Sequence, residues 1–289
     1  MPDTATVTIV GAGALGAAMA ARLGETGHQV RLWNRTAERA RSAAEGTRGV
    51  TAVDDLADAV AGSPVVFTVL RDGDAVAQVM AEVVERLDEG AVWVQASTVG
   101  PEHAGALARL ADQHGVAYLD APVSGSTTPA RQGKLVWLVA GNGQALEKVR
   151  SVLEALGSTV LHVGTGVEGS ALKLAVNAWM AAATVAMSDV LGLCDALSIE
   201  HGTFAEALEA GPLAMPYALQ KMRLMDEHSF APGFAVQLAL KDVDLAGESA
   251  ELGPLLGVVR DRLVDTVGAG HGGDDLAAVD ILRRRDRDG

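Results

Sequence analysis

The chain of 289 residues has one cysteine, few aromatic side chains and no long uncharged apolar run. Because Cys194 stands alone, no intramolecular disulfide can form, which is typical of a reducing compartment. Aromatic residues make up 3% of the chain, too few for a large pocket of stacked rings. The longest uncharged stretch in the central apolar region lies between Lys173 and Asp189 and has 15 residues, whereas a helix needs about 20 to cross a bilayer.

Positive charge is also scarce. The chain has 23 Lys and Arg residues against 37 Asp and Glu residues, a net charge of −14. Its summed field repels phosphates, so neither nucleic acid nor an anionic membrane is an expected partner. An anionic ligand therefore has to be held by local cations and backbone N–H groups. The first ten residues lack the basic segment of a secretory signal, and we expect a cytoplasmic protein.

The first half of the chain alternates short β-branched runs with Ala-rich segments typical of helices. Most of the runs are apolar without alternation, which predicts strands buried on both faces of a parallel sheet. Strand and helix in alternation predict a doubly wound α/β domain of the Rossmann type. The expected strands are Val7–Val10, Val30–Trp33, Val65–Leu70, Val92–Ala96, Val116–Ala121, Leu135–Ala140 and Thr159–Val163.

The pattern changes after Gly164. Residues from Ser170 to Leu197 are apolar on nearly every face, which predicts a long buried helix. Beyond it, helical periods are broken by Gly and Pro, and no run indicates a strand. We therefore expect an α/β domain over residues 1–164 and an all-helical domain over residues 165–289.

A glycine-rich segment follows the first expected strand at once. Its spacing, G-x-G-x-x-G, stands between a strand and a helical run. The first glycine allows a tight turn, the second lets a pyrophosphate approach the backbone, and the third lets the helix pack on the strand. An ordinary turn is the alternative, but a position opening a βαβ unit favours a dinucleotide. The residues concerned are Gly11, Ala12, Gly13, Ala14, Leu15 and Gly16.

The end of the second expected strand indicates which dinucleotide is bound. An NAD site commonly has an acid there for the ribose 2′-hydroxyl, but this chain has Asn34, Arg35 and Thr36. Arg35 can pair with a 2′-phosphate, and Arg39 can add a second cation. A solvated helix cap is the alternative. Together with the glycine loop, the segment favours NADP(H) over NAD(H).

Ser124, Gly125 and Ser126 follow the strand expected at Val116–Ala121. Their N–H groups and hydroxyls can bind a carboxylate without a cation. Spacing alone, however, favours a simple polar turn.

Lys173 and Asn177 are four residues apart in the long apolar helix, so both project from one face. Burying a lysine is costly unless it is paired or functional, and loss of solvent makes it a better acid near neutral pH. The alternative is a lysine that extends to solvent while Asn177 bonds to the backbone. The residues alone leave both interpretations open.

Two further groups indicate less. Lys241 and Asp242 are adjacent on an expected helix, usually the mark of a solvated face. His271, Asp274 and Asp275 suggest a metal site, but their glycine-rich surroundings favour a hinge loop. No His or Cys spacing of the zinc-site kind occurs, so no metal is expected.

Taken together, these segments resemble the β-hydroxyacid dehydrogenase family, which includes 3-hydroxyisobutyrate dehydrogenase, tartronate semialdehyde reductase, and glyoxylate or succinic semialdehyde reductases. An ordered series along the whole chain is more specific than any one segment. It consists of the glycine loop, Asn34–Thr36, Ser97–Val99, Asp120–Ser126 with Ala130 and Gly133, Gly166 to Asn177, and Phe230 to Asp242. Two residues depart from the family pattern, Leu15 where Met is common and Ser126 where a second Gly is usual.

The resemblance implies a Rossmann domain, a long inter-domain helix and an all-α domain, with the active site in the cleft between the domains. It implies that Lys173 is the general acid/base and that Asn177 holds the substrate or Lys173 in place. Family members usually form dimers or tetramers through the helical domain. The remaining implied contacts are to the substrate from Ser124, Gly125, Ser126 and Asp242, and to the cofactor from Leu70, Arg71, Thr98 and Lys241.

The sequence thus predicts an NADPH-dependent reductase of a small carboxylate-bearing aldehyde or keto acid, working in reverse as a dehydrogenase. One alternative is an imine reductase on the same scaffold, but that family generally lacks the lysine found at Lys173. Another is an NADPH-binding protein without catalysis, for which loss of the lysine would be the expected mark.

Overall fold

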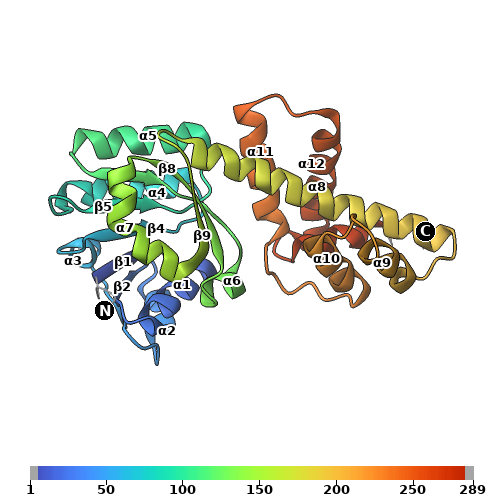
Figure 1. The fold of residues 1–289 in the computed structure, drawn as a ribbon, viewed down its shortest axis with the longest axis horizontal. Coiled ribbons are helices and arrows are strands. Elements are labelled where there is room, and N and C mark those ends of the chain that lie inside the picture. The colour runs from blue at the N-terminus through green and yellow to red at the C-terminus, as the bar shows by residue number, and fades with distance from the viewer. Residues whose placement is uncertain (1–5, 284–289) are drawn as a thin grey trace. The chain divides into compact units, whose positions relative to one another are not determined.

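The structure is a computed structural model that describes residues 6–283 (Figure 1). The chain divides into two compact units, residues 1–173 and residues 174–289. The division falls between Lys173 and Leu174, inside a long helix, whereas the sequence pattern places a domain boundary near residue 164.

The first unit contains one nine-stranded sheet, in the order β3-β2-β1-β4-β5-β6-β8-β7, with β9 beside β8. Strands β1 to β6 are parallel, and the order reverses direction between β1 and β4, as the doubly wound fold requires. The strands are β1 (Thr6–Val10), β2 (Gln29–Trp33), β3 (Val50–Ala52), β4 (Val65–Thr68), β5 (Val92–Gln95), β6 (Ala117–Asp120), β7 (Val123–Ser124), β8 (Leu135–Gly141) and β9 (Gly157–Gly164).

Helices cover both faces of this sheet (Figure 1). Residues of α1, α2 and α7 pack on one face with Ile9 and Phe67, and residues of α3, α4 and α5 pack on the other with Val66 and Trp93. Neighbouring strand residues therefore serve opposite cores, which explains the uninterrupted apolar runs. The helices are α1 (Ala14–Glu25), α2 (Ala37–Ala44), α3 (Leu56–Val60), α4 (Gly73–Val83), a 3₁₀ turn (Val84–Arg86), α5 (Gly100–Gln113), α6 (Thr127–Arg131) and α7 (Gly143–Leu156).

The predicted Rossmann sheet is confirmed, with differences at its far edge. β8 runs antiparallel to β6 and β7. Only residues 125–134, which include the short helix α6, connect β7 to β8, whereas a parallel pair needs a crossover of about a dozen residues or more. The two shortest strands, β3 and β7, have too few residues to give a pattern. β9 is an edge strand, and Leu161 is 43% exposed, so the prediction of burial on both faces is wrong there.

The second unit is helical. In the part of the chain that the structure describes, no strand follows β9, and only a single bridge joins Ala235 to Asp275. The helices pack around a core of their own that includes Leu191, Met225 and Leu263. They are α8 (Glu168–Ala196), which begins in the first unit, α9 (His201–Glu209), α10 (Pro216–Asp226), α11 (Val236–Ser249), α12 (Pro254–Thr266), a π-helical turn (Val267–His271) and a 3₁₀ turn (Leu276–Val279).

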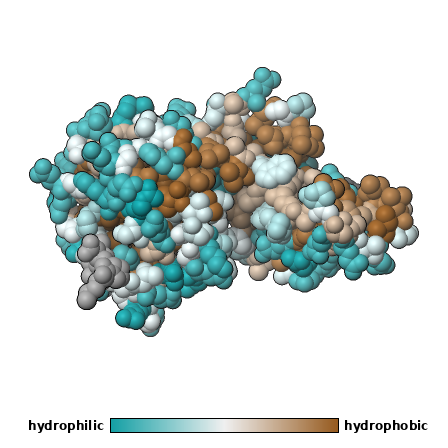
Figure 2. Space-filling view, viewed as in Figure 1, coloured by the Kyte–Doolittle hydropathy of each residue, from teal (hydrophilic) through white to brown (hydrophobic). Residues whose placement is uncertain are grey.

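The long helix α8 differs from its prediction. Its 29 residues are long and apolar enough to span a membrane, by length and composition only, yet half of its most apolar window is buried within the protein. Leu193 is 56% exposed and Trp179 is 65% exposed, so the predicted all-round burial is wrong. Figure 2 shows apolar surface at the carboxyl end of α8. The periodicity could not reveal this, because an all-round apolar helix does not show which face is covered.

Candidate active site

The glycine loop joins β1 to α1 in a tight turn. Gly11 has φ +122°, and a Cβ there would lie 2.2 Å from the Val69 carbonyl oxygen. A Cβ on Gly16 would lie 1.9 Å from the Gly11 carbonyl oxygen, so the helix packs directly against the loop. Both positions therefore exclude a side chain for reasons internal to the fold.

Gly13 has a different environment. It precedes α1 in extended conformation, and a Cβ there would meet no atom within 4 Å. No side chain caps the first turn of α1, so its first N–H donors are not taken up by a side chain. An uncapped helix N-terminus beside a glycine with open space around it fits the diphosphate of a dinucleotide.

The Asn34 segment lies beside this loop. The Asn34 Oδ1 accepts from the Ala12 N–H at 3.1 Å, and the Asn34 Nδ2 donates to the Thr36 carbonyl at 3.0 Å. Arg35 and Arg39 are exposed, and within residues 6–283 neither has an ion pair. Arg41, by contrast, pairs with Asp54 and Glu38. The structure thus leaves two cations available next to the glycine loop.

Polar groups also gather at the carboxyl ends of β4 and β5. The Leu70 N–H donates to Ser97 Oγ at 2.8 Å, and Gln95 bonds to both backbone groups of Ser97. Thr98, half-buried, comes next in the chain. Arg71 is largely exposed and bonds to Asp72 through its Nε at 2.6 Å. Gln95 was not among the predicted site residues, although it is a polar residue within an apolar run.

The serine loop has a shape that depends on Gly125, which has φ +126°. Its Cβ would lie 2.9 Å from Leu135 Cδ2. Ser124 pairs with Val136 as part of β7, and Ser126 precedes α6 without capping it through its side chain. All three loop residues keep some exposure, so their polar groups are accessible.

Asp120 is a functional candidate to which the sequence pattern assigns no role of its own. The residue ends β6, is 0% exposed, and accepts two hydrogen bonds from Ser170, each of 2.6 Å. Burial raises its pKa to about 6; the bonds from Ser170 lower this pKa, and the nearby Glu168 carboxylate raises it. Burying a carboxylate without a cation beside it costs free energy. A buried carboxylate with a raised pKa is therefore a candidate for a functional residue.

Lys173 and Asn177 both lie on α8, one turn apart. Lys173 is 8% exposed and Asn177 is 3% exposed. The alternative of a lysine extended to solvent does not fit this burial. A buried amine with a buried amide one turn away can exchange a proton with a ligand and hold its acceptor atom.

Asn177 is held by a residue from the C-terminal block. The Asn177 Nδ2 donates to Asp242 Oδ2, and Lys241 Nζ lies 2.8 Å from Asp242 Oδ1. Asp242 is 2% exposed, so both of its oxygens are engaged within the protein. The adjacent Lys241 and Asp242 therefore do not form the solvated face that their spacing suggests.

The residues before α11 are anchored by a buried ion pair. Lys221 Nζ lies 2.6 Å from Asp275 Oδ1, and Asp275 Oδ2 accepts from the N–H groups of Gly233 and Phe234. In the described part of the chain, no three His, Cys, Asp or Glu side chains are grouped as a metal site. Asp275, which follows the glycine-rich segment interpreted as a hinge loop, therefore orders the loop before α11.

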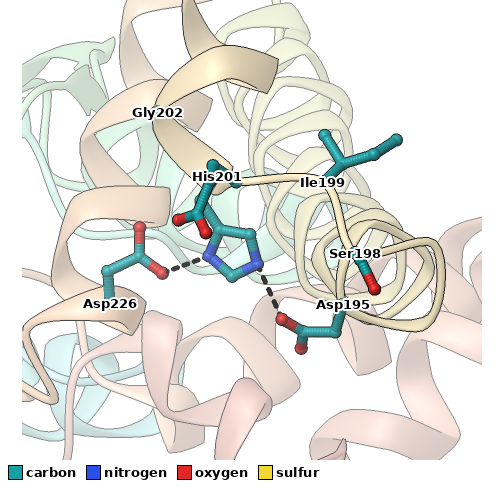
Figure 3. Close-up of a pocket in the computed structure, with 7 residues that line it drawn as sticks. Asp195, Ser198, Ile199, His201, Gly202 and Asp226 are labelled. Atoms are coloured by element: carbon teal, nitrogen blue, oxygen red, sulfur yellow. Dashed lines mark hydrogen bonds and ion pairs between the residues drawn. The ribbon is translucent and has the colours of Figure 1, made fainter.

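A hollow of about 480 Å³ lies elsewhere in the second unit (Figure 3). Its central residue, His201, lies between two carboxylates, with Nδ1 2.6 Å from Asp226 and Nε2 3.2 Å from Asp195. Each ring nitrogen thus faces a carboxylate, and none of the predicted site residues lines the hollow. The remaining lining residues are Ser198, Ile199, Glu200 and Gly202.

Two protein-family models match almost the whole chain. Residues 6–164 match the NAD binding domain of 6-phosphogluconate dehydrogenase. Residues 167–282 match a family described as NAD-binding of NADP-dependent 3-hydroxyisobutyrate dehydrogenase. The matched ranges meet close to the start of α8.

Curated relatives are similar over nearly their full length. An uncharacterized oxidoreductase of Synechocystis is 32% identical over 96% of this chain and 97% of its own. The NAD-dependent L-serine dehydrogenase of Pseudomonas aeruginosa is 29% identical, covering 85% of each chain. Glyoxylate/succinic semialdehyde reductase 1 of Arabidopsis thaliana is 28% identical, covering 94% and 96%.

Solved structures agree with these matches. The 3-hydroxyisobutyrate dehydrogenase of Mycobacterium tuberculosis, solved with L-serine, has a TM-score of 0.88 and 26% identity, covering 97% of this chain and 99% of its own. A reductive aminase from Aspergillus terreus with NADPH and ethyl levulinate has a TM-score of 0.66 and 24% identity, covering 96% and 98%. The aminase therefore shares the fold at a lower similarity.

Proposed function

The chain belongs to the β-hydroxyacid dehydrogenase family, and on this premise we propose that it is an NADPH-dependent reductase of a small aldehyde or keto acid that bears a carboxylate. In reverse, the same site oxidises the β-hydroxy acid. Family membership already makes it a nicotinamide-dependent oxidoreductase. The observation that carries the finer proposal is the buried Lys173, one turn before the buried Asn177.

The proposed acid is Lys173. Reduction of a carbonyl requires a hydride at carbon and a proton at oxygen, and the nicotinamide, when bound, supplies the hydride. Lys173 donates the proton from Nζ to the developing alkoxide, and in oxidation it takes the proton back. Asn177, held by Asp242, presents a fixed amide one turn after Lys173 on α8.

The serine loop is proposed to bind the carboxylate of the substrate. Ser124, Gly125 and Ser126 offer backbone N–H groups and two accessible hydroxyls, which suit an anion in a protein of net charge −14. Asp242 was expected to contact the substrate. Because its oxygens already engage Asn177 and Lys241, we assign it instead to orienting these two residues.

The preference for NADP is proposed from Arg35 and Arg39. These cations lie beyond β2 without ion pairs in the described chain, beside a loop whose residues fit a diphosphate. A 2′-phosphate is the group that would use them. That Leu70, Arg71, Thr98 and Lys241 contact the cofactor stays a prediction.

The deciding test compares the wild-type protein with Lys173→Ala. NADPH consumption is followed with glyoxylate, succinic semialdehyde, tartronate semialdehyde, short β-keto acids and one cyclic imine, and oxidation is followed with 3-hydroxyisobutyrate and L-serine. We expect carbonyl turnover to fall about 10²–10⁴-fold in the variant, as for loss of a general acid.

Lys148→Ala is the matched control, because Lys148 is exposed on α7 of the first unit. Turnover in Lys173→Ala within about tenfold of wild type would refute the acid/base assignment. Turnover of the imine alone would favour imine reduction. NADPH binding without turnover of any compound would favour a binding protein.

A further inference from the structure

Asp120 is a buried carboxylate that has no part in the proposed reaction. It is wholly buried at the end of β6, and within residues 6–283 no ion pair involves it. Both carboxylate oxygens bond to one residue, Ser170, through its N–H and its hydroxyl. A carboxylate in such a place is retained only where its position matters, because an apolar residue would be cheaper to bury.

The bonds to Ser170 act on the first turn of α8. This helix begins at Glu168, so the Ser170 N–H is one of the four that have no partner within the helix. Asp120 is thus a cap supplied by a strand 50 residues earlier in the chain. Its negative charge also suits the positive end of the helix dipole.

Gly169 allows the start of α8 to approach the sheet closely. A Cβ on Gly169 would lie 2.4 Å from the Leu138 carbonyl oxygen and 2.6 Å from the Asp120 carbonyl oxygen. The helix therefore starts in direct contact with the backbones of β6 and β8. Such a start leaves little freedom for the turn that follows.

Lys173 is in that next turn, three residues after Ser170, and on the same side of the helix. We propose that Asp120 is a positioning residue, which holds the first turn of α8 through Ser170 and so aligns the Lys173 amine for proton transfer. This inference rests on the proposed function, in which Lys173 is the acid.

Titration of Asp120 makes the arrangement sensitive to pH. Two titratable groups face Asp120, Glu168 on α8 and Tyr118 on β6. The residue of β8 that pairs with Asp120 is Ala140, which has no charge. The pKa of Asp120 is raised to about 6 by burial. Above this pH the carboxylate accepts both bonds. When protonated, it has one acceptor fewer, and Lys173 loses its alignment.

The test uses three substitutions, with the pH profile of kcat as readout. Asp120→Leu removes both acceptors, and we expect kcat to fall about 10²-fold, with KM for NADPH unchanged within about twofold, since small misplacements of a catalytic group cost this much. In wild type, kcat should fall below a midpoint near pH 6. Asp120→Asn has one carbonyl acceptor, like the protonated acid, and cannot titrate, so we expect a lowered kcat without this acidic limb.

Ser170→Ala gives an independent check. Without the hydroxyl, the carboxylate loses a bond that lowers its pKa, so the acidic limb should move to higher pH. Asp112→Asn is the matched control, because Asp112 is an exposed carboxylate on α5 of the same unit. Retention of the limb in Asp120→Asn, or kcat within about threefold of wild type in Asp120→Leu, would overturn the proposal.

A second readout needs no substrate. Reductive methylation with ¹³C-formaldehyde labels the lysines, and Lys173→Arg identifies the signal of Lys173 among those of Lys134, Lys148, Lys221 and Lys241. The signal of Lys173 should shift with a midpoint near pH 6 in wild type and not in Asp120→Asn. A shift that is absent in wild type, or unchanged in the variant, refutes the positioning role. Failure to reduce any carbonyl refutes the proposed function instead and leaves this titration as the test.

Discussion

Two residues of the glycine loop, Gly13 and Gly16, are expected to affect different properties of the protein: cofactor affinity and the free energy of unfolding. Gly13 faces open space and has φ −71°, which alanine adopts readily, whereas Gly16 lies against the Gly11 carbonyl. We expect Gly13→Ala to change the free energy of unfolding by less than about 1 kcal/mol and to weaken NADPH binding at least tenfold, because the methyl group fills the space needed by the diphosphate.

Gly16→Ala is the matched comparison in the same loop. Its Cβ would overlap backbone, so we expect a loss of stability of about 1–3 kcal/mol, as for other overpacked sites. Urea denaturation gives the stabilities, and quenching or enhancement of NADPH fluorescence gives the affinity. Unchanged NADPH affinity in Gly13→Ala would mean that the diphosphate lies elsewhere.

Arg35 allows a test of cofactor choice at the same scale. If Arg35 pairs with the 2′-phosphate, Arg35→Ala should weaken NADPH by about 1.5–3 kcal/mol, the usual value of a hydrogen bond to a charged group, and leave NADH nearly unchanged. Titration calorimetry with both cofactors measures this difference. Arg48→Ala is the control, because Arg48 is exposed just before the amino end of β3, whereas Arg35 follows the carboxyl end of the parallel neighbour β2. Equal losses for both cofactors in Arg35→Ala would contradict the assignment.

At the scale of elements, the helix N-termini of the first unit differ in whether a side chain caps them. Side chains cap α3, α4 and α7, through Asp55, Asp72 and Asn142. No side chain caps α1, α2, α5 or α6. Of these helices, α1 and α2 follow the carboxyl ends of β1 and β2, where the phosphates of a dinucleotide are expected.

Helix α8 bears on the oligomeric state. Its exposed apolar side chains include Trp179 and Leu193, and large exposed apolar patches mark interaction surfaces. We expect a homodimer or homotetramer that buries this face. Leu193→Glu should therefore dissociate the oligomer without changing helical content.

Light scattering coupled to size exclusion measures the mass, and circular dichroism measures the helical content. Leu161→Glu is the control, because Leu161 is exposed on β9 in the first unit. A wild-type protein that is monomeric at micromolar concentration would contradict the expectation.

At the scale of the whole molecule, stability should depend on Asp120. A carboxyl whose folded pKa is about 6 and whose ordinary value is 3.8 binds more protons in the folded state between these pH values. Its contribution to stability is therefore complete below about pH 4 and lost as pH rises through 6. The loss is on the order of 2–3 kcal/mol, from about 1.4 kcal/mol per pKa unit.

Asp120→Asn isolates this effect from the other titrating groups. The free energy of unfolding, measured in urea at pH 4.5 and pH 7.5, should fall more for wild type than for the variant between the two pH values. An identical fall in both proteins would show that Asp120 does not titrate in this range. The same measurements on Asp112→Asn control for the removal of an ordinary exposed carboxylate.

The sequence by itself determined the fold class and the place of the glycine loop. These features are local, because apolar runs, helical periods and glycine spacing depend on neighbouring residues, and β1, β2, β4, β5 and β6 follow the predicted runs. It also indicated Arg35 and Lys173 as candidates, since their neighbours in the chain make a basic turn and an apolar helix. Short elements such as β3 and β7 were not predicted, because two or three residues are too few to show a strand pattern.

Only the tertiary structure decided which distant side chains meet. Asp120 and Ser170 are 50 residues apart, Asn177 and Asp242 are 65 apart, and Lys221 and Asp275 are 54 apart. No spacing rule links such positions, because the loops between them can have any length and still bring the same groups together. The exposed face of α8 could not be predicted either. An apolar side chain is buried only where another segment packs against it, and the segments that pack against α8 come from elsewhere in the chain.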